Sequence, residues 1–498
     1  MKLHIVFILL FSGLILTCLN AQESNDIRLL VRGDDIGMSH SANEPCIEAI
    51  AYQDLFTEPK RKPNVIFLLI DDQRNTSLGC AGHPIIKTPV IDDLANEGVR
   101  FSNAFVTTSI CAASRASIFT GMHERSHQFT FNTKPLSQEY LKNSYSVLLG
   151  NAGYHTGFIG KYGVVVEGYQ PHELFDSFRP LDRWMYFKKQ QDGSERHITE
   201  LMGDYTGDFL QNVPAGEPFC LSLSFNAAHA EDADKENHFP WPKAVDAMYD
   251  DVEIPEPRLS DPAIFDGQPD FLKNSMNRDR YYWRWDTPEK YQKNMRAYFR
   301  MISGIDRVIG RIRDELKQNG QDENTVIIYM GDNGYYMGDR GFAGKWSHYE
   351  ESLRVPLIIY DPRLPEQHRG QVQDKMALNI DVPSTILDIC GIDIPQQYEG
   401  RNLMPLVLGE NPSDWRTDLF CEHLMETASI PKWEGVRDER YVYARYFEQE
   451  PAYEFLHDLE TDPDQLKNFA TDPDYSSILE EMRTHCDELK SEYESNRK

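Results

Sequence analysis

The sequence has few cysteines, no excess of positive charge, and no long apolar run after its first residues. Its 498 residues include 8 cysteines and no Cys-x-x-Cys pair, so neither a disulfide framework nor a zinc site is indicated. Asp and Glu outnumber Lys and Arg by 79 to 51, for a net charge of −28. This charge argues against a nucleic-acid partner, whose phosphates favour basic surfaces.

Residues 1–21 have the pattern of a secretory signal. A basic start is followed by an apolar run over residues 5–16 and then by small and polar residues. Cleavage after Ala21 and lipidation at Cys18 both fit this pattern, and cleavage is the favoured reading. No later stretch reaches the roughly 18 apolar residues that span a bilayer. We therefore expect an exported protein, periplasmic or secreted, whose one route to a membrane is a lipid anchor at Cys18.

An apolar stretch at residues 27–32 runs into Asp34 and Asp35. This segment resembles the opening of the ChbG/YdjC-like carbohydrate deacetylases, in which paired aspartates serve catalysis and metal binding. The resemblance ends before the next apolar run, and no His-rich metal motif of that family follows. We interpret residues 22–62 as a short N-terminal extension and linker.

From residue 63 onward the pattern alternates strands and helices, as in an α/β fold. Residues 64–70 and 325–330 are continuous apolar runs, typical of strands buried on both faces of a parallel sheet. Thr88 and the proline after it predict a helix that stops near Gly98. Apolar residues at three- and four-residue spacings predict a long helix over 291–319, with Gly320 as its cap.

Both apolar strands end in acidic or amide side chains. Asp71 and Asp72 follow the first strand, and Asp332 and Asn333 follow the second. Open α/β sheets bind ligands at the carboxyl ends of their strands, and such oxygens suit Ca²⁺ or Mg²⁺. Polar turns without a metal remain the alternative for each dipeptide.

A single cysteine, Cys111, stands in the stretch SICAASRASIFTG at residues 109–121. A Cys-x5-Arg phosphatase loop would need arginine at position 117, which is Ser117, so that chemistry is excluded. Ser114, Arg115 and the helical residues after them predict an anion-receiving turn at a helix N-terminus. A buried structural cysteine is the remaining alternative.

The stretch CAASR followed by TG resembles the signature of the type I sulfatases, in which the cysteine is oxidised to formylglycine. Further matching stretches are PNVIFLLIDDQR, TGFIGKYG, SFNAAHA, GDNGYYMGDRG and GKWSHYEESLRVPLIIYDP. The resemblance implies an alkaline-phosphatase-like α/β core, with a large mixed sheet flanked by helices, as a catalytic domain over 63–395. It also implies a smaller C-terminal α+β subdomain with an antiparallel sheet over 396–498.

The resemblance also implies a mechanism. A formylglycine-generating or anaerobic sulfatase-maturating enzyme would convert Cys111, whose hydrate would attack the sulfur of a sulfate ester. Arg115 would fix this residue, Lys161 and Lys345 would bind the sulfate, and His229 would protonate the leaving oxygen. Ca²⁺, in preference to Mg²⁺, would be held by Asp71, Asp72, Cys111 as formylglycine, Asp332 and Asn333.

One position departs from the family pattern. Many members have a histidine where this chain has Gly163, and that histidine helps to deprotonate the second hydroxyl. We hypothesise that Lys161, His123 or His348 takes this role.

Aromatic and charged residues gather in the segments 239–257 and 277–292, where the family builds its outer pocket. Stacking aromatics beside Arg and Lys would suit an anionic sugar, although ordinary packed loops give the same pattern. We expect a sulfated polysaccharide or oligosaccharide as substrate. A phosphonate or phosphate monoester hydrolase and a catalytically weak glycan-binding homologue are the alternatives.

Overall fold

The computed structural model describes residues 10–11, 14–15, 61–168 and 170–497. The chain divides into two units, Met1–Arg61 and Lys62–Lys498. In the first, β1 (Leu10–Phe11) pairs antiparallel with β2 (Leu14–Ile15). Cys18, Ala21 and the Asp34-Asp35 pair lie outside the described residues, so the predictions of a signal, an anchor and a deacetylase-like segment stay predictions.

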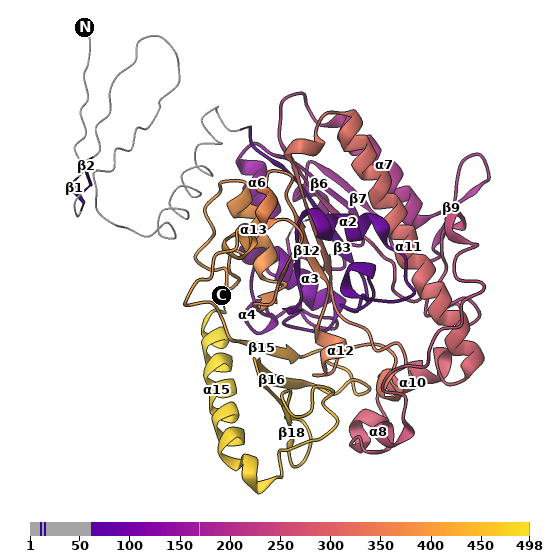
Figure 1. Cartoon of the computed structure of the whole chain (residues 1–498), viewed down its shortest axis with the longest axis vertical. Helices are drawn as coiled ribbons and strands as arrows, with labels where there is room; N and C mark the ends of the chain where they lie inside the picture. The colour runs from indigo at the N-terminus through magenta and orange to yellow at the C-terminus, as the bar shows by residue number, and fades with distance from the viewer. Residues whose placement is uncertain (1–9, 12–13, 16–60, 169, 498) are drawn as a thin grey trace. The chain divides into compact units, whose positions relative to one another are not determined.

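An eight-stranded mixed sheet forms the centre of the second unit (Figure 1), with the order β13-β4-β12-β11-β3-β10-β6-β7. The strands are β3 (Asn64–Ile70), β4 (Val99–Phe101), β6 (His155–Gly160), β7 (Ser177–Pro180), β10 (Phe219–Ser224), β11 (Thr325–Gly331), β12 (Leu357–Tyr360) and β13 (Gln371–Gln373). The central neighbours β11, β3, β10 and β6 are mutually parallel. Their carboxyl ends therefore meet at one edge.

Helices cover both faces of this sheet, because side chains alternate across each strand. Val65, Phe67 and Leu69 of β3 enter one core, and Ile66 and Leu68 enter the other. The first core also takes residues from α3 (Cys111–Thr120), α6 (Tyr145–Asn151) and α13 (Asp381–Ile389). The second takes residues from α2 (Pro89–Glu97), α7 (Ile198–Asn212) and α11 (Pro288–Gln318).

The predicted long elements are present with small shifts at their ends. The strand over 64–70 has the predicted bounds, and α2 begins after Thr88 and ends before Gly98. The long helix α11 starts three residues earlier than predicted, because the Thr287 side chain accepts a hydrogen bond from the Lys290 backbone N–H at 3.3 Å and caps it.

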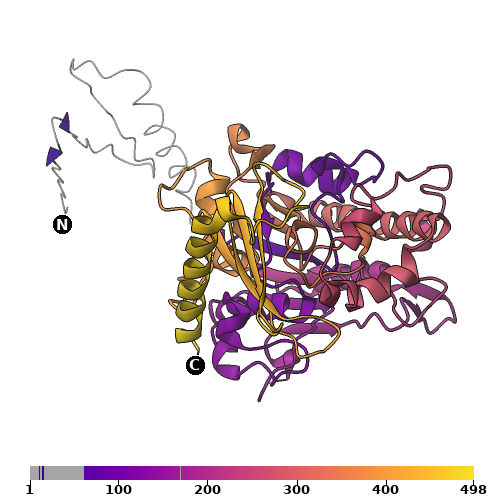
Figure 2. The same ribbon diagram turned by 90° about the horizontal axis from the view of Figure 1, so that it is seen from below.

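A second sheet lies in the C-terminal part and is antiparallel throughout, with the order β15-β16-β17-β18. Its strands are β15 (Asp418–His423), β16 (Trp433–Asp438), β17 (Tyr441–Tyr446) and β18 (Tyr453–Asp458). The helix α15 (Ser476–Ser495) packs along it through Leu479, Met482 and Cys486 (Figure 2). The predicted fold class, a mixed α/β core with a smaller α+β part, is confirmed.

Short elements connect these layers. They are α4 (Glu124–His127), α5 (Gln138–Leu141), α8 (Pro262–Asp266), α9 (Asp270–Lys273), α10 (Met276–Arg284), α12 (Glu350–Leu353), α14 (Met404–Val407), β5 (Ala104–Phe105) with β14 (Ala377–Leu378), and β8 (Phe187–Lys189) with β9 (Glu195–His197). Among the described residues, none of the helices combines the length and the apolar character that crossing a bilayer requires.

Candidate active site

The four central parallel strands all lead into predicted site residues at the same sheet edge. These are Asp71 and Asp72 after β3, Lys161 after β6, His229 in the loop after β10, and Asp332 and Asn333 after β11. Because the strands are adjacent, residues up to 261 positions apart come into hydrogen-bond contact. The sheet topology thus assembles the site.

Backbone and side-chain hydrogen bonds hold the two acidic turns together. The Asp72 backbone N–H donates to Oδ1 of Asp332 at 3.2 Å, and Nδ2 of Asn333 donates to Oδ1 of Asp72 at 2.7 Å. Asp72 has a positive φ of 55°, a conformation uncommon for residues other than glycine. Both turns are buried, so their carboxylates face one another in a region that excludes water.

Cys111 is the first residue of α3, which ends at Gly121 with a φ of 68°. Its Sγ lies within 4.8 Å of carboxylate oxygens of Asp71 and Asp332. All ten residues of α3 are buried. The predicted nucleophile position therefore stands at the positive end of a buried helix, against the acidic turns.

Three cations face these carboxylates. Lys161 forms an ion pair with Asp71, and Lys345 forms one with Asp72. Arg115 donates from Nε to Oδ2 of Asp332 at 2.9 Å and from Nη1 to the carbonyl of Lys161 at 2.6 Å. The structure thus brings Cys111, Arg115, Lys161 and Lys345 together with the acidic turns.

The charges in this cluster shift each other's proton affinities. Burial raises the pKa of Asp71, but Lys161, Lys345 and Arg115 outweigh it, so its pKa lies below the ordinary value. Burial and the charge of Asp71 raise the pKa of Asp332 to about 6, despite the opposing effect of Arg115. One more positive charge among these oxygens would stabilise both carboxylates in their ionised form.

Three buried oxygens in the cluster have no hydrogen-bond partner: Oδ1 of Asp71, Oδ2 of Asp72 and Oδ1 of Asn333. Buried polar atoms are normally paired, and carboxylate and amide oxygens are the ligands that Ca²⁺ and Mg²⁺ prefer. The residues present therefore fit a divalent cation of the hard, oxygen-binding kind.

His229 contacts both the acidic cluster and an arginine that the sequence analysis did not single out. Its Nε2 lies 3.6 Å from Oδ2 of Asp72, and its Nδ1 lies 2.7 Å from Nη1 of Arg183. The carbonyl oxygen of Ala230 also lies 2.7 Å from Nδ1. A guanidinium only donates and a carbonyl only accepts, so these two contacts favour opposite tautomers of the ring. Burial and Arg183 hold the pKa of His229 well below its ordinary value. One ligand atom from each of Asp71, Asp72 and His229 lies within 4.8 Å of the other two.

Further charged residues surround this histidine. Arg183 and Asp232 lie in loops, and Arg280 and Arg284 lie one turn apart on α10. Within the segment 277–292, sequence composition pointed to this region, but no spacing in the sequence connects α10 with the two loops.

Much of the other aromatic segment, 239–257, packs in the core. Its Phe239, Tyr249 and Ile254 are buried in the core that contains α11. Tyr249 also contacts Ser303 of that helix through a 2.6 Å hydrogen bond. These buried residues support the packed-loop alternative for this segment, and Phe239 also lies 6.0 Å from the guanidinium of Arg284.

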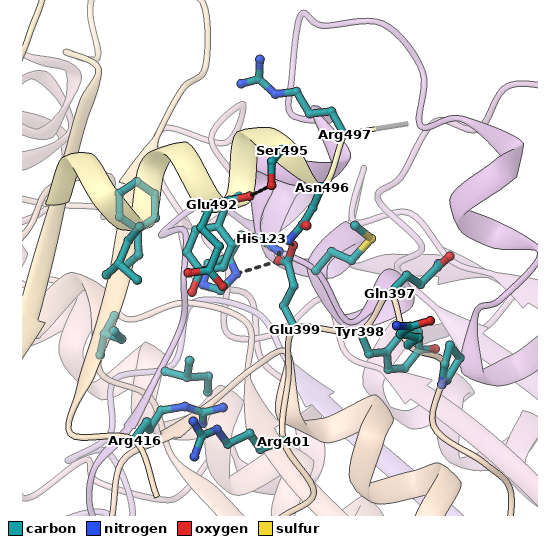
Figure 3. Close-up of a pocket in the computed structure, with 18 of the residues that line it drawn as sticks. His123, Gln397, Tyr398, Glu399, Arg401, Arg416, Glu492, Ser495, Asn496 and Arg497 are labelled. Carbon is teal, nitrogen blue, oxygen red and sulfur yellow. Dashed lines mark hydrogen bonds and ion pairs between the residues drawn. The ribbon is translucent and has the colours of Figure 1, made fainter. Parts of the chain in front are cut away.

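Two of the three hypothesised bases lie away from the acidic cluster. His123 follows the far end of α3 and lines a cavity of about 1050 Å³ beside α15, where its Nδ1 contacts Glu399 at 2.8 Å (Figure 3). His348 is buried against the C-terminal sheet, 3.0 Å from the Tyr446 hydroxyl and 3.1 Å from Nε2 of His457. The hypothesis that either one acts at Cys111 is wrong, and Lys161 remains.

Gly163 occupies a backbone position that resists a side chain. Its φ is +73°, and a Cβ there would meet Cδ of Arg115 at 3.1 Å. A histidine at this position would strain the backbone and crowd Arg115. The departure from the family pattern is therefore built into the local geometry.

Family models match most of the chain. The model described as "Sulfatase" matches residues 63–392, and the one described as "N-sulphoglucosamine sulphohydrolase, C-terminal" matches residues 338–492. An N-acetylglucosamine-6-O-sulfatase of Bacteroides thetaiotaomicron is 26% identical over an alignment 510 residues long. The alignment covers 88% of this chain and 88% of that protein.

Solved structures share the fold. A structure described as a complex with its substrate D-glucosamine-2-N,6-O-disulfate has a TM-score of 0.75 at 23% identity, covering 88% of this chain and 99% of the other. The phosphonate monoester hydrolase from Silicibacter pomeroyi has a TM-score of 0.73 at 24% identity, covering 87% of this chain and 96% of that one. The predicted alkaline-phosphatase-like fold is confirmed.

Proposed function

Since the chain belongs to the sulfatase family, whose members are sulfuric ester hydrolases, we propose that it removes sulfate from a sulfated carbohydrate. One observation carries this proposal. Cys111 at the start of α3 meets a set of buried acidic residues with unpartnered oxygens, surrounded by Lys161, Lys345 and Arg115. A site with this much positive charge suits an anion that accumulates charge during reaction.

A divalent cation and an oxidised Cys111 would complete the site. We propose Ca²⁺, with Mg²⁺ as the alternative, held by Asp71, Asp72, Asp332, Asn333 and residue 111. When bound, the cation would neutralise sulfate oxygens and lower the pKa of a nearby hydroxyl. Oxidation of Cys111 to formylglycine by a maturating enzyme would supply an aldehyde hydrate with two hydroxyls. One hydroxyl would attack the sulfate sulfur, and deprotonation of the other would then re-form the aldehyde and release the sulfate.

The chain's own residues then position the ester and move protons. Lys161 and Lys345 bind the sulfate oxygens as point charges. His229, in its protonated form, would give the proton on Nε2 to the leaving oxygen and become neutral, while the Ala230 carbonyl accepts from Nδ1. Lys161 is proposed as the base for the second hydroxyl, since Gly163 has no side chain to do so. In that later step Lys161 would act from its neutral form and would no longer bind the sulfate as a cation.

The name of a relative supports a proposal for the substrate class. The Bacteroides relative is named for N-acetylglucosamine 6-O-sulfate, so we propose a glycosaminoglycan-like or algal glycan with sulfated sugars. Export to the periplasm or the medium, where such polymers are met, is proposed on the N-terminal pattern of residues 1–21.

Mass spectrometry of the tryptic peptide that contains residue 111 tests the mechanism, after expression with a maturating enzyme. The mass of the peptide with formylglycine is expected, and an unmodified thiol at residue 111 in active protein would contradict the mechanism. Turnover of an aryl sulfate is then compared with that of an aryl phosphate and a phosphonate monoester. Faster turnover of either phosphorus ester would favour the alternative hydrolase, and no turnover of any ester or glycan by the modified protein would favour a glycan-binding homologue.

A further inference from the structure

Three arginines converge on a single carboxylate beside His229. Nη2 of Arg280 lies 3.0 Å from Oδ2 of Asp232, and Nη2 of Arg183 lies 3.6 Å from the same oxygen. Arg284 forms an ion pair with the other oxygen, Oδ1. Since one negative charge meets three positive ones, this cluster, Arg183-Asp232-Arg280-Arg284, carries an excess of positive charge.

The cluster keeps donors that no protein group uses. Among the described residues, Nε of Arg280 and Nε of Arg284 are buried without a hydrogen-bond partner. Burial and the neighbouring Arg284 lower the pKa of Arg280, although Asp232 opposes them. A guanidinium that is short of partners in this way is suited to receive an anion.

The cluster is also close to the reacting centre and open to a ligand. Nη1 of Arg183 lies 2.7 Å from Nδ1 of His229, so one imidazole ring separates it from the Nε2 that lies 3.6 Å from Asp72. The side chains of Arg183 and Arg280 are 31% and 13% exposed, whereas that of Arg284 is fully buried. Arg183 and Arg280 can therefore meet a ligand, and the buried Arg284 holds Asp232 through its ion pair.

Indole rings lie beside residues of the cluster. Trp184 is 65% exposed next to Arg183, and Arg280 lies over the ring of Trp346 at 4.9 Å. Lys235 lies over the ring of Trp283 at 3.6 Å. Aromatic faces beside cations provide both a stacking surface for a sugar ring and charge for its substituents.

We infer that Arg183 and Arg280 form a subsite for a second anionic group of the substrate, a sulfate or a carboxylate. This group would lie on the sugar that bears the scissile sulfate or on the adjoining sugar. The inference rests on the proposed function, because it takes His229 to mark the position of the leaving oxygen. Arginine binds both sulfate and carboxylate through two parallel N–H donors, and the substrate would thus be a polyanionic glycan.

The test compares three substrates: a monosulfated hexosamine, the same hexosamine with a second sulfate, and the monosulfated hexosamine linked to a uronic acid. The wild-type enzyme should show a kcat/KM at least about tenfold higher for one of the two dianionic substrates, as expected for one added charge-assisted hydrogen bond. A preference for the disulfated sugar identifies sulfate, and a preference for the uronic acid identifies carboxylate.

The variant Arg280→Gln should reduce that preference by about tenfold to a hundredfold, and Arg280→Lys should retain part of it. Arg278→Gln is the matched control on the same helix, because Arg278 stacks on Phe265 and donates to the carbonyl of Gly341 without contacting Asp232. It should leave the ratio of the two kcat/KM values unchanged.

Equal loss of kcat/KM on all three substrates in Arg280→Gln would overturn the subsite, as would a wild-type enzyme without preference. Even if Arg280→Gln does not fold, the comparison of the three substrates with the wild-type enzyme can still overturn the subsite. Turnover of a small aryl sulfate by the wild-type enzyme keeps the two proposals apart, because it tests sulfate ester hydrolysis without a second anion.

Discussion

The carboxylates near the two ends of α3 are hydrogen-bonded in different ways. At its N-terminal end, oxygens of Asp71, Asp72 and Asn333 lack hydrogen-bond partners. At its C-terminal end, Glu399 accepts from the His123 backbone N–H at 2.6 Å and from Nδ1 of His123 at 2.8 Å. Its other oxygen accepts from Ser126 at 2.6 Å and from Nδ2 of Asn496 at 2.8 Å.

From this difference we infer that the N-terminal end of α3 serves catalysis and that its C-terminal end serves stability. A buried polar atom without a partner costs about 1–3 kcal/mol, so a group of such atoms at one end indicates a site that a ligand completes. At the other end, both carboxylate oxygens of Glu399 accept hydrogen bonds, which connect α4, the 395–401 loop and the end of α15. We expect substitutions at the first end to abolish activity and substitutions at the second to lower stability.

The largest effect is expected for Cys111→Ala. It removes the group that would become the nucleophile, so aryl sulfate turnover should fall by at least about a thousandfold. The thermal midpoint should stay close to that of the wild type, because the helix start keeps its backbone and loses one small side-chain atom. Activity within tenfold of the wild type would contradict the assignment of the nucleophile.

Removal of divalent cations should have the next largest effect. Treatment with a chelator should lower turnover by at least about a hundredfold, and added Ca²⁺ should restore it. Independently of activity, Ca²⁺ should raise the thermal midpoint of the wild type, because it binds the folded state alone. Asp71→Asn is the matched variant, and a midpoint that rises equally in both proteins would locate the cation elsewhere.

At the opposite end of α3, Glu399→Gln should lower the free energy of unfolding by about 2–4 kcal/mol, because an amide NH₂ would face the donors that the carboxylate accepts from. Turnover per folded molecule should stay within about twofold of the wild type. Urea unfolding and active-site titration measure the two quantities. Loss of turnover without loss of unfolding free energy would contradict a purely structural role for Glu399.

The same variant should show a pH dependence. Burial raises the pKa of Glu399, but hydrogen bonds from His123 and Ser126 outweigh it, so the folded-state pKa lies below the ordinary 4.5. A lowered carboxyl pKa stabilises the fold above the unfolded-state value, and this stabilisation is lost as pH falls through the folded-state value. The gap in unfolding free energy between wild type and Glu399→Gln should therefore narrow below pH 4.5.

The smallest effect is expected for Gly163→Ala, with Gly153→Ala as its control. Both glycines have positive φ, +73° and +81°, but a Cβ at Gly153 meets nothing within 4 Å. Each substitution should lower the unfolding free energy by about 1 kcal/mol. Only Gly163→Ala should also lower kcat, by about threefold to tenfold, because it displaces Arg115. Equal kcat values in the two variants would show that Arg115 tolerates the contact.

Much of the acidic cluster could be predicted from the sequence, because local rules determine it. Apolar strands that end in Asp71-Asp72 and in Asp332-Asn333 place oxygens at one sheet edge once the strands are parallel neighbours. Lys161, His229 and Lys345 entered through motif resemblance, since nothing in their spacing connects them.

Other parts could not be predicted because they depend on tertiary packing. Arg183, Asp232 and Arg280 meet through loops and a short helix without a periodic pattern. His348 stands only three residues after Lys345, yet it faces the C-terminal sheet, because the chain turns between them. Proximity in a motif therefore did not imply proximity in space.

The complete burial of α3 has a consequence for the order of events in biosynthesis. In the folded protein Cys111 is only 4% exposed, which leaves little of it accessible to another enzyme. If a maturating enzyme oxidises Cys111, as proposed, we expect this oxidation to precede packing of the helix. A chain that folded first would then be stable but inactive, and the yield of active protein would depend on the relative rates of modification and folding.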